Sequence, residues 1–307
     1  MRLSRLVPVG PGDPLSEAWL PPPPLPPCSS TSASTTATTT TIAPTASNGP
    51  TGTALTAVTK QVTGIPASVT DKVAAGGVNS GIFIAATTSS AIQSAASELG
   101  SYYATVNGTA LTSNGKPELL FLGGEYCPYC AAERWAMVNA LSRFGTFTGL
   151  TTTHSSTSDV YPNTPTFTFS KAKYTSNYLT FTSVEEYANY RQGNSSNSNT
   201  PYVTLQTATT AESALEAAYD PTGAIPFLDF GNKYVEVGNL SPLSPSMLAG
   251  KTWTQVAAAM NDPSSSLGKA LVGNANFITA GICKLTNNQP ASACTPVIQQ
   301  LEANLAA

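Results

Sequence analysis

Two cysteines separated by two residues are the part of this sequence best suited to chemistry: Cys127 and Cys130, with Pro128 and Tyr129 between them. Thiols at this spacing can exchange with a disulfide, because a thiolate attacks one sulfur of the disulfide and a second thiol then resolves the mixed product. We interpret the four residues as a redox-active dithiol in which Cys127 attacks and Cys130 resolves. Tyr129 is expected to lie exposed beside the reactive sulfur and to contact the substrate.

A buried strand and a helix are predicted on either side of the dithiol. Residues 119–122 are an apolar run bounded by turn residues, which is typical of a buried strand. Pro128 suits the first position of a helix, and apolar residues then recur at helical spacing as far as Phe144, so we expect an amphipathic helix that Gly145 closes. Cys127 would lie at the helix N-terminus, where unpaired N–H groups and the helix dipole stabilise a thiolate. The pKa of such a cysteine commonly falls from about 8.5 into roughly the range 3.5 to 7.5.

A second element is Ile225-Pro226, which directly precedes a predicted β-hairpin. Residues 227–230 and 234–237 are strand-like and are joined by a Gly-Asn-Lys turn. The order of strand, CxxC helix, long insertion, Ile-Pro pair and hairpin resembles the thioredoxin superfamily. That resemblance implies an α/β fold in which the Ile225-Pro226 bond is cis and faces Cys127, with Pro226 in the active site and Ile225 in contact with the substrate.

Four stretches carry a closer resemblance. They are residues 62–69 (VTGIPASV), 124–135 (GEYCPYCAAERW), 164–169 (TPTFTF) and 282–286 (ICKLT). They resemble the prokaryotic domain-of-unknown-function family 929 (DUF929), itself thioredoxin-like and without an assigned activity. The resemblance spans about residues 55–305. Members commonly carry a membrane anchor upstream, and here a Pro/Thr-rich segment stands in the place of that anchor.

The expected domain organisation follows from changes in composition. Residues 1–53, rich in Pro, Ser and Thr, are predicted to be a disordered tether, because such a tract cannot bury apolar surface. Residues 54–307 are expected to form a thioredoxin-like domain, with an insertion over about 145–222 and a C-terminal helical extension over about 263–307. The secondary structure predicted besides the dithiol unit and the hairpin comprises short helices over 58–73, strands at 82–84, 147–160 and 166–170, and helices at 185–191, 211–219, 253–260, 267–278 and 297–305.

Two further cysteines, Cys283 and Cys294, are expected to form a structural disulfide across a polar loop. The bridge would stabilise the fold by roughly 3 kcal/mol in the chain-entropy model. One alternative is an electron-relay pair for the main dithiol. Another is a zinc site made by all four cysteines, although the second pair lacks the usual ligand spacing. We expect no metal and no cofactor.

Several neighbours of the dithiol have two interpretations. Glu125, Glu133 and Arg134 form either a solvated face or an ion pair, or else they tune the dithiol or carry protons. His154 is the single histidine and could serve a Cys-His hydrolase, but nothing in the sequence places it beside a cysteine.

Composition narrows the class of function. The net charge is −3 and there is no basic run, which argues against nucleic-acid binding. No apolar run reaches the length of a membrane span, and the first 20 residues do not read as a signal peptide. Paired cysteines and a surface with few charges favour an extracytoplasmic protein, secreted or on the cell surface. The sequence therefore predicts a thiol-disulfide oxidoreductase that acts on protein thiols or disulfides with an unidentified redox partner; the alternative is a non-catalytic binding or scaffold module.

Overall fold

The computed structural model describes residues 49–76, 83–85, 90, 103–237, 243–303 and 305. Nearly all of the predicted tether, including Cys28, lies outside these residues. The first described element is helix α1 (Gly52–Thr63), which begins just before the expected domain boundary at residue 54.

The core of the protein is a mixed sheet of seven strands in an α/β fold. Its members are β1 (Phe83–Ala85), β2 (Tyr103–Thr105), β3 (Thr112–Ser113), β4 (Lys116–Gly123), β9 (Thr180–Glu185), β12 (Phe227–Phe230) and β13 (Tyr234–Val237). Strand β4 pairs with three others: it is parallel to β9 and antiparallel to β12 and β3. The hairpin β12–β13 continues the sheet to β2, which pairs with β1 in parallel. The predicted strand at 119–122 and the predicted hairpin are both confirmed.

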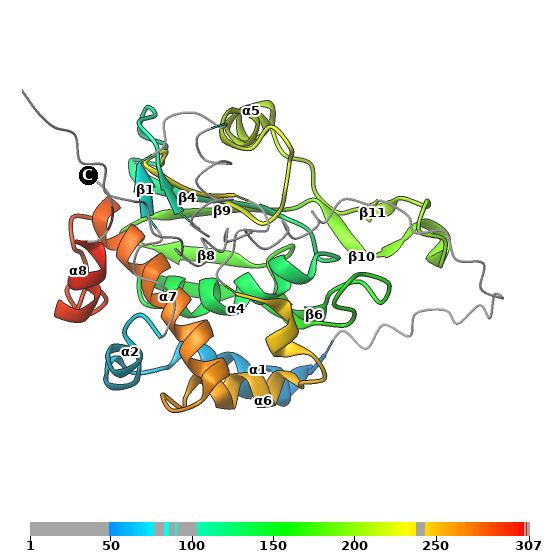
Figure 1. Ribbon diagram of the computed structural model, residues 1–307, viewed down its shortest axis with the longest axis horizontal. Helices are drawn as coiled ribbons and strands as arrows, with labels where there is room; N and C mark the ends of the chain where they lie inside the picture. The colour runs from blue at the N-terminus through cyan, green and yellow to red at the C-terminus, as the bar shows by residue number, and fades with distance from the viewer. Residues whose placement is uncertain are drawn as a thin grey trace, which may run out of the picture.

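Helices cover both faces of this sheet. They are α1, α2 (Ala67–Val73), α4 (Pro128–Leu141), α5 (Thr210–Tyr219), α6 (Trp253–Met260), α7 (Ser266–Leu285) and α8 (Pro296–Glu302), with short 3₁₀ turns at Gln192–Asn194 and Pro245–Leu248. Figure 1 shows α4 and α7 on one side of the sheet and α5 on the other. The predicted helices at 211–219 and in the C-terminal region are confirmed.

The alternation of side chains along β4 explains the two layers. Leu119 and Phe121 belong to the larger buried cluster, which includes residues of α4 and α7. Leu120 and Leu122 belong to a second cluster, against which Leu215 of α5 packs. Successive side chains of a strand point to opposite faces, so an uninterrupted apolar run is needed where both faces are covered.

Helix α4 is buried on every side, so the prediction of an amphipathic helix is wrong. All 14 of its residues are buried. Its polar residues are tolerated because they have partners: Asn274 of α7 donates to Glu133, and Asn139 donates to the carbonyl of Val62 in α1.

The expected closure of this helix at Gly145 is also wrong, because α4 ends at Leu141 and Ser142 caps it. Gly145 instead begins β5 (Gly145–Thr148), which pairs with β8 (Lys173–Ser176). A Cβ at this position would lie 2.4 Å from the carbonyl oxygen of Thr175, so glycine permits the two strands to approach.

The region expected as an insertion consists mainly of short strand pairs. Besides β5 and β8, it contains β6 (Thr151–His154) paired with β7 (Pro165–Thr168), and β10 (Tyr187–Arg191) paired with β11 (Tyr202–Thr204). Figure 1 shows β10 and β11 extending away from the main sheet. The strands predicted at 147–160 and 166–170 are confirmed only over β5, β6 and β7, because turns interrupt them.

The prediction of a helix at 185–191 is wrong. Glu185 ends β9 and residues 187–191 form β10. Backbone bonds to the turn after β4 hold this segment extended: Glu186 N–H donates to Gly123 at 2.7 Å, and Glu125 N–H donates to Tyr187 at 2.8 Å.

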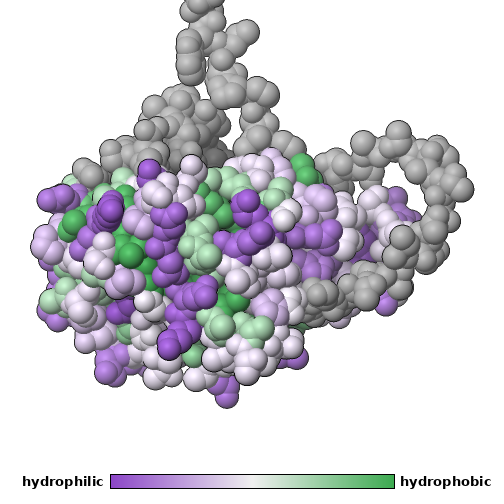
Figure 2. Space-filling model, turned by 90° about the horizontal axis from the view of Figure 1, so that it is seen from below, coloured by the Kyte–Doolittle hydropathy of each residue, from purple (hydrophilic) through white to green (hydrophobic). Residues whose placement is uncertain are grey.

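The face that carries α1 and α6 has a mixed surface. Figure 2 shows small groups of hydrophobic residues there, interspersed with hydrophilic ones. Among the described helices, none has the length and apolar character needed to cross a membrane.

Candidate active site

The dithiol lies where β4 ends and α4 begins. Cys127 is the N-cap residue of α4 and Pro128 occupies the first turn, as the sequence predicts. The carbonyl of Cys127 accepts a hydrogen bond from the N–H of Ala131 at 3.0 Å, which starts the helix. Neither Cys127 nor Cys130 is in a disulfide, and both are fully buried.

The loop before β12 brings Ile225-Pro226 against the dithiol. The Sγ of Cys127 lies 3.6 Å from the carbonyl oxygen of Ile225, and the thiol is placed to donate to it. The Ile225-Pro226 peptide bond is cis, and both residues are buried. Residues 98 positions apart in the sequence therefore meet at this sulfur.

Two glycines before the dithiol leave room for the Cys130 sulfur and for neighbouring aromatic rings. A Cβ on Gly123 would lie 2.4 Å from Cζ of Phe121 and 3.2 Å from Sγ of Cys130. A Cβ on Gly124 would lie 2.8 Å from the ring of Tyr126. The Cys130 sulfur thus packs directly against the backbone at the end of β4.

Tyr129 is not exposed, so the expectation that it lies open beside the sulfur is wrong. It is 5% exposed and its ring meets that of Tyr161 edge-on, with centroids 6.2 Å apart. The aromatic residue beside the dithiol that retains partial exposure is Tyr126, whose ring stacks on Tyr202 at 4.3 Å. The loop before β7 and the β10–β11 hairpin therefore supply the aromatic surroundings of the motif.

The environment of Cys130 strongly favours its protonated form. Burial raises the pKa of the Cys130 thiol well above its usual value, and the hydrogen bond to Cys127 and the charge on that sulfur raise it further. The positive charge of Arg134 and the backbone of Gly124 act in the opposite direction. Cys130 consequently keeps its proton until something stabilises its thiolate.

A buried ion pair lies beside the dithiol. Arg134 donates through Nε and Nη2 to the two carboxylate oxygens of Glu185 at 2.7 and 2.5 Å. Nη2 also donates to the carbonyl of Gly124 at 2.8 Å. The side chains of Arg134 and Glu185 are both fully buried. The interpretation of Arg134 as part of a solvated face is thus wrong, and sequence reasoning missed Glu185 because it assigned that segment to a helix.

Glu125 is a further carboxyl group close to the motif. It is nearly buried, and the hydroxyl of Thr168 donates to it at 2.6 Å. Burial raises the pKa of Glu125, while the Thr168 hydrogen bond lowers it. The carboxyl group therefore titrates at a higher pH than an exposed glutamate.

Cys283 and Cys294 form the disulfide that the sequence predicts. Their sulfurs are 2.02 Å apart and join the C-terminal end of α7 to the loop before α8. The bond occupies two of the four sulfurs that the alternative zinc site would need. Within the described residues, no three Cys, His, Asp or Glu residues are grouped as metal ligands would be.

His154 has a structural environment within the insertion. It ends β6, is buried, and its Nδ1 lies 2.7 Å from the carbonyl oxygen of Ser155. The side chain of Asn189 donates to the His154 carbonyl at 2.9 Å. These contacts join β6 to β10 and give the Cys-His hydrolase interpretation no support.

Residues 102–284 match the sequence model of a family described as "Domain of unknown function (DUF929)". The chain belongs to this family. The DUF929 match covers the dithiol, Ile225-Pro226 and Cys283, whereas Cys294 lies beyond its end. Comparison with curated proteins finds no match, and neither does comparison with solved structures.

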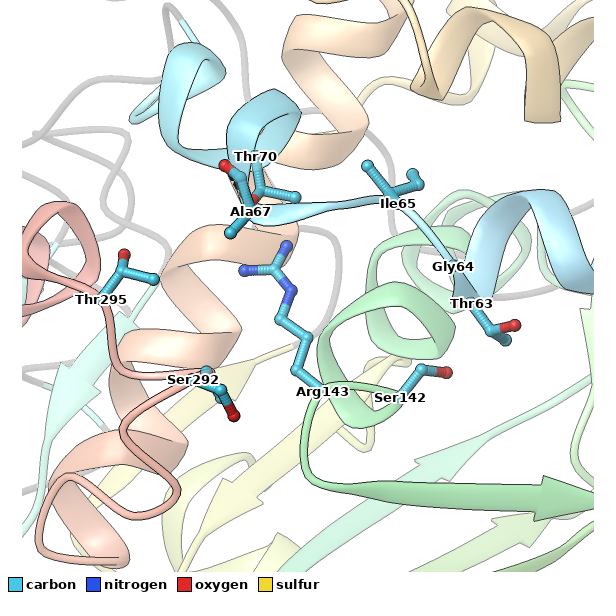
Figure 3. Close-up of a pocket in the computed structure, with 10 residues that line it drawn as sticks. Thr63, Gly64, Ile65, Ala67, Thr70, Ser142, Arg143, Ser292 and Thr295 are labelled. Atoms are coloured by element: carbon cyan, nitrogen blue, oxygen red, sulfur yellow. Dashed lines mark hydrogen bonds between the residues drawn. The ribbon is translucent and has the colours of Figure 1, made fainter.

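This DUF929 protein has a cavity of about 250 Å³ near the C-terminal end of α4, whereas the dithiol lies at the N-terminal end of that helix. Figure 3 shows the side chain of Arg143 pointing into it, between α2 and the loop that carries Ser292. Arg143 donates to the side-chain oxygens of Asn139 and Asn276 at 2.6 and 2.8 Å. With a rise of about 1.5 Å per residue, α4 separates this cavity from the dithiol by roughly 20 Å. The arginine therefore links α4 to α7 and has no part in the chemistry of the dithiol.

Proposed function

We propose that this chain is a thiol-disulfide oxidoreductase with a thioredoxin-like fold, acting on thiols or disulfides of other proteins. The observation that carries the proposal is the position of Cys127. It caps a buried helix, and its sulfur lies 3.6 Å from the carbonyl oxygen of Ile225, the residue before Pro226. A thiolate at the N-cap of a helix is favoured by the free N–H groups of the first turn, toward which the sulfur can turn once it ionises.

The connectivity of the sheet supports the thioredoxin-like assignment. Along the chain, β4 leads through the dithiol to α4, and β9 then lies parallel beside β4. Helix α5 follows on the opposite face, and the β12–β13 hairpin completes the order β13-β12-β4-β9. The order of β4, the CxxC helix α4, Ile225-Pro226 and the hairpin is the one that the resemblance to the thioredoxin superfamily implies; β9 and α5 lie within the region expected as an insertion, about 145–222.

The proposed reaction proceeds by two exchanges at sulfur. The Cys127 thiolate attacks one sulfur of a substrate disulfide, forms a mixed disulfide with it and releases the other sulfur as a thiolate. Cys130 then loses its proton and attacks the Cys127 sulfur, which releases the second substrate thiolate. The substrate disulfide is reduced and the dithiol is oxidised to a disulfide, which a redox partner must reduce again. The reverse sequence oxidises substrate thiols.

The raised pKa of Cys130 supports this division of roles. Burial and the neighbouring Cys127 sulfur both raise the pKa of the Cys130 thiol, whereas the N-cap position of Cys127 favours attack by that sulfur. The second exchange then depends on a later deprotonation of Cys130, which separates attack from resolution.

An extracytoplasmic location belongs to the same proposal. The Cys283–Cys294 disulfide supports it, because disulfides persist in oxidising compartments and are rare where thiol buffers keep cysteines reduced. The substrates would then be proteins outside the cytoplasm.

A second candidate function is a non-catalytic binding or scaffold module. The observation that favours it is the complete burial of both dithiol sulfurs. A protein substrate can reach Cys127 only if the segments that cover the sulfur move apart. The two candidates differ in whether the dithiol reacts, which a direct measurement decides.

The test uses the full chain with Cys28→Ser, so that Cys127 and Cys130 are its two thiols outside the disulfide. The protein is equilibrated with glutathione buffers of defined ratio, and the fraction of Cys127–Cys130 disulfide is measured by mass spectrometry after alkylation. We expect a reduction potential between about −270 and −120 mV, the range of known catalytic dithiols. A potential below about −300 mV would instead place the pair with inert structural disulfides and leave the scaffold function.

A second measurement assigns the nucleophile. Reduced single-cysteine variants, Cys127→Ala and Cys130→Ala in the same background, are treated with iodoacetamide at neutral pH. Cys127 should be alkylated faster than Cys130. Equal rates, or faster alkylation of Cys130, would reverse the proposed roles.

A further inference from the structure

Arg134 occupies a position from which its charge can act on the resolving sulfur. It lies four residues after Cys130 in α4, and side chains four apart lie on the same face of a helix. Its guanidinium is fully buried, held by Glu185 on one side and by the carbonyl of Gly124 on the other. The remaining nitrogen, Nη1, is buried and has no hydrogen-bond partner in the described part of the chain.

Gly124 connects this guanidinium to the sulfur. Its carbonyl accepts a hydrogen bond from Arg134, and its backbone, like the charge of Arg134, lowers the pKa of the Cys130 thiol. The same sulfur packs against Gly123, where a Cβ would approach it to 3.2 Å. Arg134, Gly124 and Cys130 therefore form one contiguous buried group.

Some of the charged groups around the dithiol act on Cys130 and others act on Arg134. The charge of Cys127 acts on Cys130, while Glu185 and Glu125 act on Arg134. Glu133, three residues after Cys130 in α4, accepts two hydrogen bonds from the side chain of Asn274 in α7. Among these charged groups, Arg134 is the one that lowers the pKa of the Cys130 thiol, against the effect of burial.

We propose that Arg134 is a positioning residue whose buried charge stabilises the Cys130 thiolate during resolution of the mixed disulfide, and that Glu185 moderates this effect. The inference rests on the proposed function. In the step concerned, Cys130 loses a proton to solvent and its sulfur bonds to the sulfur of Cys127. The bond between Cys127 and the substrate sulfur breaks, and the substrate leaves as a thiolate. A positive charge near the buried thiolate makes this deprotonation less costly.

The experiment follows the resolution step directly. Reduced full-length protein with Cys28→Ser is mixed with Ellman's reagent, which first forms a mixed disulfide on Cys127. Attack by Cys130 then releases a second coloured aromatic thiolate, whose rate is recorded as a function of pH. The decisive comparison is between Glu185→Gln and the double variant Arg134→Gln/Glu185→Gln. Both lack the ion pair, and they differ only in the side chain at position 134, which is charged in one variant and neutral in the other.

The double variant should resolve at least about threefold more slowly than Glu185→Gln. A neighbouring opposite charge lowers a pKa by roughly one unit or more. Losing that effect reduces the thiolate about tenfold per unit, which the higher nucleophilicity of a more basic thiolate partly offsets. Glu185→Gln alone should resolve faster than the parent protein, because the arginine charge is then no longer neutralised.

Equal rates and equal pH profiles in Glu185→Gln and the double variant would overturn the inference, because a merely structural role leaves the pH profile unchanged. Circular dichroism checks folding. If the double variant does not fold, two other variants decide. Arg134→Lys should keep the parent pH profile of the resolution rate, and Glu185→Gln should shift that profile to lower pH. Failure of either expectation also overturns the inference. Failure of the parent protein to release the second thiolate would instead refute the proposed function.

Discussion

Replacing Asp229 with asparagine should make the protein more stable at neutral and alkaline pH. Asp229 lies in the middle of the sheet on β12 and is fully buried. One carboxylate oxygen accepts the N–H of Asn232, while the other is buried without a hydrogen-bond partner in the described structure. Burial raises the pKa of Asp229 to about 7; the Asn232 hydrogen bond opposes this rise and the charge of Glu118 adds to it. Asparagine keeps the acceptor oxygen but never ionises.

The size of the effect follows from the shift in pKa. The folded-state pKa is about 7 and the unfolded value 3.8, so the folded state holds its proton over a range in which the unfolded state does not. The stabilisation from this group is therefore complete below the unfolded pKa and is lost as the pH rises through the folded pKa. At about 1.4 kcal/mol per unit, the total loss approaches about 4 kcal/mol, of which about 3 kcal/mol falls between about pH 5 and pH 8.

Urea unfolding of the parent protein and Asp229→Asn at these two pH values measures the effect. The difference in free energy of unfolding should widen by about 3 kcal/mol in favour of the variant at the higher pH. Glu118→Gln serves as a control, because removing the neighbouring charge should lower the pKa of Asp229 and narrow the gap. A difference that stays constant with pH would show that the Asp229 carboxylate is not destabilised by burial and would refute the reasoning.

Two further changes test the surroundings of the two cysteine pairs. Cys283→Ala/Cys294→Ala should reduce the free energy of unfolding by about 3 kcal/mol, because the bridge closes a short loop with a sequence separation of 11. Urea unfolding measures this loss, and the parent protein reduced with dithiothreitol should show the same free energy of unfolding as the double variant. If the reduced parent stayed about 3 kcal/mol more stable than the variant, the loop explanation would be contradicted. Gly123→Ala should cost about 1 to 3 kcal/mol, because its Cβ would overlap the Phe121 ring and press on Cys130. Unchanged stability in Gly123→Ala would mean that the end of β4 is less tightly packed than its contacts imply.

The sequence by itself was sufficient for features that depend on neighbouring residues. The apolar run before the dithiol, the proline after Cys127 and the turn between the hairpin strands each specify local backbone geometry, and the structure contains the elements that they predict. The pairing of Cys283 with Cys294 could be anticipated for the same reason, since a short loop brings them together. Membership in DUF929 was also readable from short local strings, and the family match confirms it.

Only the tertiary structure decided which polar residues are buried and what they contact. Arg134 and Glu133 have the spacing of a solvated helix face, yet α4 is buried on all sides because α1, α7 and the sheet enclose it. Glu185 lies at the start of a segment that the sequence predicts as a helix, whereas the structure pairs it in parallel with Gly123 of β4. The burial of Tyr129 likewise depends on Tyr161, far along the chain. The spacing of apolar residues within a segment indicates its secondary structure but not which other segments pack against it. The contacts around the dithiol therefore depend on residues far apart in the sequence.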